Sequence, residues 1–139
     1  MKDLQNAGIL LVEDNPNDAE LTERALKKIG LQGGLAIARD GAEALEYLRS
    51  SRPKPKVIFL DLKLPKIDGI EVLRRVRADD RTKAIPVVVL TSSREERDVM
   101  DTYNLGLNSY IVKPVDFSNF VHAVSELGIY WGILNKIPY

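Results

Sequence analysis

The stretch Val57-Ile58-Phe59-Leu60-Asp61, four apolar residues followed by an acid, decides the fold class. Two further runs of four apolar residues occur at Ile9 to Val12 and at Val87 to Leu90. A continuous apolar run of this length suits a strand that is buried on both faces, as in a parallel sheet. Two weaker runs, Leu35 to Ala38 and Tyr110 to Val112, bring the expected number of strands to five.

Stretches with the periodicity of amphipathic helices separate the apolar runs. The residues that recur at intervals of three or four are Leu21, Ala25 and Ile29 in one stretch and Ile70, Leu73 and Val76 in another, and the apolar stripe of such a helix faces the core. Asn15-Pro16 has the residue types that begin a helix, so the first helix is expected from about Pro16 to Ile29. Alternating strands and helices predict a doubly wound α/β fold in three layers, with a parallel sheet between two layers of helices.

The composition limits the classes of protein to consider. The 139 residues suit one domain over residues 1–139, and 45% hydrophobic with 29% charged residues is an ordinary globular balance. The 20 basic and 20 acidic residues cancel, so we expect no nucleic-acid partner. Because the sequence has neither a membrane-spanning apolar segment nor a signal sequence, we expect no membrane association and a cytoplasmic location.

Polar residues follow four of the apolar runs, where ligands bind in open α/β sheets. In sequence order, Glu13 and Asp14 follow the run that ends at Val12, and Asp61 follows the run that ends at Leu60. Thr91 follows the run that ends at Leu90, and Lys113 the run that ends at Val112. A single acid after a strand is usually only a turn or capping residue. Five residues of these types, from four strand ends, indicate a shared site instead.

The predicted site has the groups that phosphoryl transfer requires. Three crowded carboxylates repel one another unless a cation lies among them, and an all-oxygen ligand set favours Mg²⁺. Asp61, alone at the end of the central strand, is the candidate nucleophile that would form an aspartyl phosphate. Lys113 would supply a positive charge and Thr91 a hydrogen-bond donor to the phosphoryl group.

Four motifs resemble those of the response-regulator receivers of two-component signalling, over nearly the whole chain. They are Leu11-Val12-Glu13-Asp14-Asn15, the loop from Asp61 to Gly69, Leu90-Thr91-Ser92 and Val112-Lys113-Pro114. The resemblance implies a flavodoxin-like sheet of strand order 2-1-3-4-5 with five helices. It also implies that the backbone carbonyl of Lys63 joins Glu13, Asp14 and Asp61 in binding Mg²⁺.

The resemblance further implies how the protein signals. Tyr110 would be the rotating aromatic residue that reports the position of Thr91, although a half-buried aromatic on an edge strand is the simpler interpretation of Tyr110. Asp61 would accept its phosphoryl group from a sensor histidine kinase. The protein would be a switch that catalyses only its own Mg²⁺-dependent phosphorylation and dephosphorylation.

A finer resemblance is to the phytochrome-associated response regulators, which are single-domain proteins and commonly homodimers. It covers Glu13 to Ala19 and Asn108 to Pro114. It implies a phytochrome-type light sensor as the kinase. Since no effector domain is apparent, we expect a stand-alone regulator that signals by protein contact in a phosphorelay.

The C-terminal segment 129–139 is expected to extend the domain and to contact a second copy. Its candidate dimer contacts are Ile129, Tyr130, Trp131 and Leu134, which would form an apolar patch if exposed. The alternative is that the segment folds back on its own domain, and Gly128 and Gly132 disfavour a longer helix.

Two other functions stay open at this point. A phosphatase or related hydrolase would use Asp61 as nucleophile but needs a second acid beside it, whereas position 63 is Lys. A phosphorylation-independent scaffold would not need the five site residues that are present. The single histidine, His122, is expected to be structural or on the surface.

Overall fold

The computed structural model describes residues 8–27, 34–50, 53–64, 66–91, 109–113 and 116–126. Strands and helices alternate within these ranges, and none of the helices is long and apolar enough to cross a membrane. The elements are β1 (Ile9–Val12), α2 (Pro16–Lys27), β2 (Leu35–Ala38), α3 (Gly41–Arg49), β3 (Val57–Asp61), α4 (Gly69–Ala78), β4 (Val87–Thr91), β5 (Ser109–Val112) and α6 (Phe117–Glu126).

The five strands form one parallel sheet in the order β2-β1-β3-β4-β5, as predicted. β3 lies in the centre, where Leu60 pairs with Val12 of β1 and with Val89 of β4. Four of the five expected helices lie within the described residues. The remaining one, expected between β4 and β5, falls in residues 92–108, outside the described part of the chain.

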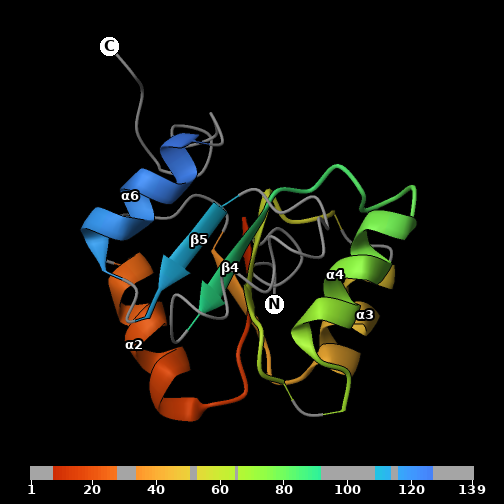
Figure 1. Ribbon diagram of the computed structural model, residues 1–139, viewed down its shortest axis with the longest axis horizontal. Helices are drawn as coiled ribbons and strands as arrows, with labels where there is room; N and C mark the ends of the chain where they lie inside the picture. Colours follow the sequence, from red (N-terminus) through yellow and green to blue (C-terminus); the bar gives the residue numbers. More distant parts are fainter. Residues whose placement is uncertain are drawn as a thin grey trace.

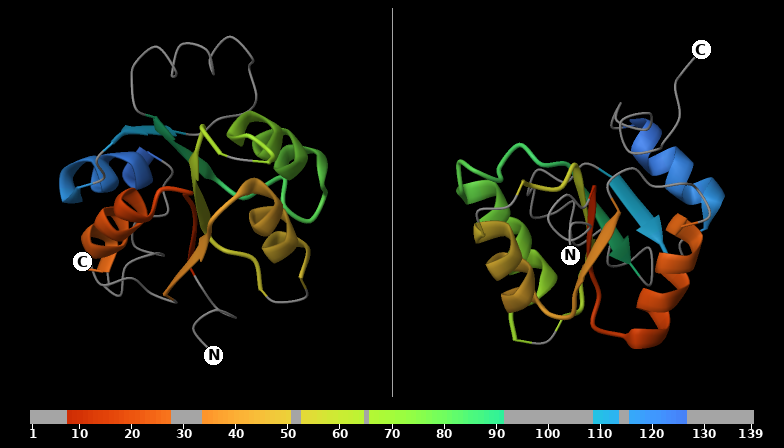
Figure 2. Two further views of the ribbon diagram at one scale, coloured as in Figure 1. Left: turned by 90° about the horizontal axis from the view of Figure 1, so that it is seen from below. Right: turned by 180° about the vertical axis from the view of Figure 1, so that it is seen from behind.

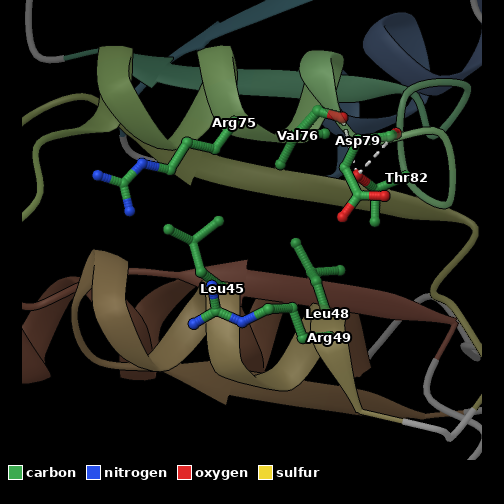
Figure 3. A pocket seen from close by; sticks show the side chains of 7 residues that line it. All are labelled: Leu45, Leu48, Arg49, Arg75, Val76, Asp79 and Thr82. Atoms are coloured by element: carbon green, nitrogen blue, oxygen red, sulfur yellow. Dashed lines mark hydrogen bonds between the residues drawn. The ribbon is translucent and has the colours of Figure 1, made fainter.

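Two helical layers cover the sheet, α2 and α6 on one face and α3 and α4 on the other (Figure 1 and Figure 2). The pleat sends successive side chains of a strand to opposite faces. In β1, Leu10 and Val12 therefore belong to the core beside α3 and α4, whereas Ile9 and Leu11 belong to the core beside α2 and α6. The three inner strands, β1, β3 and β4, are buried along their whole length because both of their faces are covered.

Capping side chains begin the helices at the end of the sheet where the strands finish. Asn15 Oδ1 accepts hydrogen bonds from the N–H groups of Asn17 and Asp18 at 2.9 and 3.0 Å, so the predicted cap of α2 is confirmed. Asp40 and Asp68 cap α3 and α4 in the same way. These caps fix where each helix leaves the carboxyl edge of the sheet.

The buried face of α2 differs from the one predicted. Leu21 is 51% exposed, and the buried residues of the helix are Ala19, Thr22 and Leu26. A step of four residues advances 40° beyond a full turn, so a strict interval of four leaves the buried stripe, whereas steps of three and four together follow it. Ile29 lies outside the described residues. In α4 the prediction is confirmed, since Leu73 and Val76 are buried and Ile70 packs against the same core.

We predict that two leucine-to-alanine substitutions on α2 have very different effects on stability. Leu26→Ala removes a fully buried side chain and should lower the free energy of unfolding by about 2–5 kcal/mol. Leu21→Ala, the matched control on the exposed side, should change it by less than about 1 kcal/mol. Urea denaturation of both variants measures the difference. Equal losses would contradict this assignment of the buried face.

Candidate functional site

The carboxyl edge of the sheet brings Glu13, Asp61 and Lys113 to the same face. The sheet hydrogen bonding continues one residue beyond two strands, with Glu13 N–H donating to Ala38 O at 3.0 Å and Lys113 N–H to Thr91 O at 2.9 Å. Alternation along each strand then directs all three side chains toward the α2 and α6 face. In Figure 1 this edge is where the arrows of β4 and β5 end and where α2 begins.

The three predicted acids meet at this edge. Glu13 is fully buried, Asp61 is 6% exposed and Asp14 is exposed. One carboxylate oxygen from each lies within 4.8 Å of the others. Backbone donors hold the two buried carboxylates, since Asn15 N–H donates to Glu13 Oε2 at 3.3 Å and Lys63 N–H to Asp61 Oδ1 at 3.2 Å. The acids predicted from separate strand ends therefore form one cluster.

Lys113 places its ammonium among the carboxylates. Its Nζ donates to Asp61 Oδ2 at 3.0 Å and to Asp18 Oδ2 at 3.1 Å, and lies 2.8 Å from Glu13 Oε1. Burial alone would lower the pKa of Lys113, but its contacts with Glu13 and Asp61 outweigh burial and hold the pKa above the usual value. The ammonium is therefore kept charged.

The pKa of Glu13 is also raised, to about 7, which for a carboxyl group favours the neutral form. Burial is the largest cause, the neighbouring Asp61 carboxylate adds to the rise, and Lys113 opposes it. A single ammonium thus compensates the buried carboxylates only in part. A bound cation would favour the ionised form of Glu13 further.

Two buried oxygen atoms indicate what the site can accept. Among the described residues, Thr91 Oγ1 has no hydrogen-bond partner, and Glu13 Oε1 has none besides its ion pair with Lys113 Nζ at 2.8 Å. A buried oxygen without a hydrogen bond is costly. The carboxylate oxygen faces a cluster whose donor atoms suit a hard divalent cation. Thr91 ends β4, the strand beside β3, and its role as a donor to a phosphoryl oxygen stays a prediction. The residues therefore fit Mg²⁺ and a phosphoryl group.

The loop after Asp61 is held tightly against the sheet. Gly69 N–H donates to Leu62 O at 3.0 Å, and a Cβ atom added at Gly69 would lie 2.5 Å from Asp61 O. Only glycine allows the start of α4 to approach the end of β3 this closely. Lys63 lies in this loop, and the role of its carbonyl as a metal ligand stays a prediction.

Tyr110 lies on β5, beside the strand that carries Thr91. It pairs in register with Val89, and it is half-buried against the core on the α3 and α4 side. Its role as a switch with Thr91 also stays a prediction. His122 is exposed on α6. The candidate dimer contacts at residues 129–134 lie outside the described residues.

Residues 9–125 match the family of response regulator receiver domains, and the chain belongs to this family. The bacteriophytochrome response regulator AtBRR is 52% identical over 92% of this chain and 96% of its own, with a TM-score of 0.84. The Mn²⁺-bound form of response regulator Rcp1, a Synechocystis protein, is 38% identical over 94% of this chain and 96% of its own, with a TM-score of 0.71. The "Probable methanogenesis regulatory protein FilR2" of Methanothrix harundinacea is 43% identical over 94% of this chain and 86% of its length.

The predicted family and fold are confirmed by these comparisons. A receiver domain is a phosphoacceptor switch rather than a conventional enzyme, so the hydrolase alternative is set aside. The triad of Glu13, Asp14 and Asp61 is typical of the metal site of receivers.

Asp18 is a contact of the site that the sequence analysis missed. It lies in the first turn of α2, four residues after Asp14, and its carboxylate accepts a hydrogen bond from Lys113. Asp18 does not lie at or just after the end of a strand, unlike the five predicted site residues. An acid in the first turn of the next helix was a further signal, because that turn begins at the same edge of the sheet.

We predict that Mg²⁺ stabilises the protein without any phosphodonor. A ligand that binds only the folded state adds about 1.4 kcal/mol at ten times its dissociation constant, so the melting temperature should rise with Mg²⁺. Asp14→Asn should abolish most of that rise because it removes one of the three clustered carboxylates, and it should still fold because Asp14 is exposed.

The control for this measurement is Asp80→Asn, which removes an exposed acid that pairs with Lys83 away from the site. This variant should respond to Mg²⁺ as the parent does. Thermal unfolding with and without Mg²⁺ measures all three proteins. If the melting temperature of the parent does not change with Mg²⁺, the predicted metal site is ruled out.

Proposed function

We propose that the chain is a response regulator that accepts a phosphoryl group on Asp61 from a sensor histidine kinase and signals through protein contact. The observation that carries this proposal is the surroundings of the Asp61 carboxylate. It is nearly buried at the end of the central strand, 3.0 Å from the Lys113 ammonium and beside two further acids.

Each neighbour of Asp61 has a part in the proposed transfer. An Asp61 carboxylate oxygen attacks phosphorus while the bond from phosphorus to the kinase imidazole nitrogen breaks, and the imidazole leaves with the electron pair. Lys113 and Thr91 donate hydrogen bonds to the phosphoryl oxygens, where charge is concentrated. Glu13, Asp14 and Asp61 would hold Mg²⁺, which would supply further neutralisation of that charge when bound.

The proposed kinase is of the phytochrome type. Two bacteriophytochrome response regulators, AtBRR and RtBRR, are 52% and 50% identical to this chain, each with a TM-score of 0.84. The match to AtBRR covers 92% of this chain and 96% of AtBRR, so the similarity extends over nearly the whole of that protein. The relative from Methanothrix harundinacea is named for methanogenesis, so the kinase is identified by comparing phosphoryl transfer from different kinases directly.

We predict that the purified protein gains the mass of one phosphoryl group from acetyl phosphate, only with Mg²⁺ present. Asp61→Asn should gain none, because the carboxamide is a poor nucleophile, and Asp80→Asn should react as the parent does. Intact-protein mass spectrometry measures all three proteins.

The proposed kinase is tested by transfer of a labelled phosphoryl group from a bacteriophytochrome kinase, compared with transfer from an unrelated histidine kinase. If the parent reacts with neither acetyl phosphate nor a kinase, the alternative of a phosphorylation-independent scaffold is favoured.

We also propose that residues 129–139 mediate a homodimer through Ile129, Tyr130, Trp131 and Leu134. The support is the apolar sequence of this segment, since interfaces are enriched in aromatic residues. The described part of α6 ends at Glu126, and it is fixed to the core by the buried Phe120, which stacks on Phe59 with 5.8 Å between ring centroids. The segment can therefore be removed while this part of α6 stays in place.

We predict that a chain ending at Gly128 is a folded monomer, whereas the full chain is a dimer. Light scattering after size-exclusion chromatography gives the mass of each, and thermal unfolding checks that the shorter chain still unfolds cooperatively. A dimer that persists after truncation would place the interface elsewhere.

A further inference from the structure

Two hydrogen bonds hold Asp18, one through its backbone and one through its carboxylate. Its own N–H donates to Asn15 Oδ1 at 3.0 Å, which fixes the backbone in the first turn of α2. Its Oδ2 accepts a hydrogen bond from Lys113 Nζ at 3.1 Å. The second contact joins residues 95 positions apart in the sequence. It is therefore a tertiary contact between α2 and the end of β5.

The helix dipole does not explain this contact. An acid in the first turn of a helix is favourable wherever its side chain points, so the dipole accounts for the residue type alone. Glu20, the next acid on α2, pairs with Arg24 at 3.0 Å on the exposed side of the same helix. Asp18 instead directs its charge toward the ammonium of the site.

The geometry around Lys113 gives Asp18 a distinct place in the reaction. An ammonium has three N–H donors. One goes to Asp61 and one to Asp18, and Nζ also lies 2.8 Å from Glu13 Oε1 in the buried part of the site. When Asp61 receives a phosphoryl group, the ammonium has to donate to the new phosphoryl oxygens. The bond to Asp18 does not involve Asp61, so it can persist through this change and keep Nζ at the site.

Solvent exposure supports the same role. The Lys113 side chain is 18% exposed, whereas those of Glu13 and Asp61 are 0% and 8% exposed and that of Asp18 is 39% exposed. Asp18 is thus the most exposed of the three partners, and its contact restrains the long and flexible lysine side chain in addition to the contacts with Glu13 and Asp61.

We propose that Asp18 is a positioning residue that holds the Lys113 ammonium ready for phosphoryl transfer to Asp61. This inference rests on the proposed function of the site. Asp18 acts through Lys113 and does not contact the phosphoryl group, so it contributes preorganisation rather than a ligand. Its loss should slow the transfer and leave Mg²⁺ binding largely intact.

The test compares Asp18→Ala, Asp18→Asn and the control Glu20→Gln, which changes the charge of an acid on the exposed side of the same helix. The first readout is the maximal rate of phosphorylation by acetyl phosphate at saturating Mg²⁺, together with the half-saturating Mg²⁺ concentration. The second is the order of the Lys113 ammonium, measured by NMR relaxation of the ¹⁵N-labelled side chain in the unphosphorylated protein.

We expect Asp18→Ala to lower the maximal rate about tenfold, as the loss of one hydrogen bond between charged groups implies, and to shift the half-saturating Mg²⁺ concentration by less than about threefold. Asp18→Asn keeps an acceptor oxygen and should lie between Asp18→Ala and the parent. Only the two Asp18 variants should loosen the ammonium, and Glu20→Gln should match the parent in both readouts.

Several results would overturn the assignment. An Asp18→Ala protein with an unchanged or faster maximal rate would show that Asp18 does not prepare Lys113, and an unchanged ammonium order would show that it does not hold Lys113. The parent could gain no phosphoryl group while Asp18→Ala still loosens the Lys113 ammonium. That result would refute the proposed function of the site and support the contact itself.

Discussion

The contact of the Lys113 ammonium with surrounding carboxylates is the interaction on which the rest of the site depends. Burying a carboxylate without a counter-charge is costly, and here Glu13 and Asp61 are both buried. One ammonium compensates them in part and is also shared with Asp18. The remaining negative charge would favour a divalent cation at the proposed metal site. Lys113 therefore permits the fold to form around a cluster that still attracts a metal.

The sheet creates this arrangement through its regular geometry. The pleat that divides the core into two halves also sends Glu13, Asp61 and Lys113 to the same face at the carboxyl edge. The helix on that face begins beside them because Asn15 caps α2 directly after β1. The positions of these side chains thus follow from strand register and helix capping.

Much of this was predictable from the sequence, for identifiable reasons. Buried parallel strands are short and apolar throughout, so their bounds were predicted to within a residue, and with them the residues at the carboxyl edge. The buried face of α2 was not predicted, because the small Ala19 and the polar Thr22 give little apolar signal. The position of Asp18 in the first turn of α2 places it at the carboxyl edge, but its contact with Lys113 depends on how α2 lies against the end of β5, which the sequence does not specify.

The exposure of Leu21 also has a practical consequence for spectroscopy. The chain has no cysteine, so Leu21→Cys would introduce its only thiol, at a position that is 51% exposed. Position 21 lies one helical turn after Asp18, on the same side of α2. A fluorophore attached there would sit close to the acidic site without disturbing the buried face, and could follow changes of charge at Asp61 in real time.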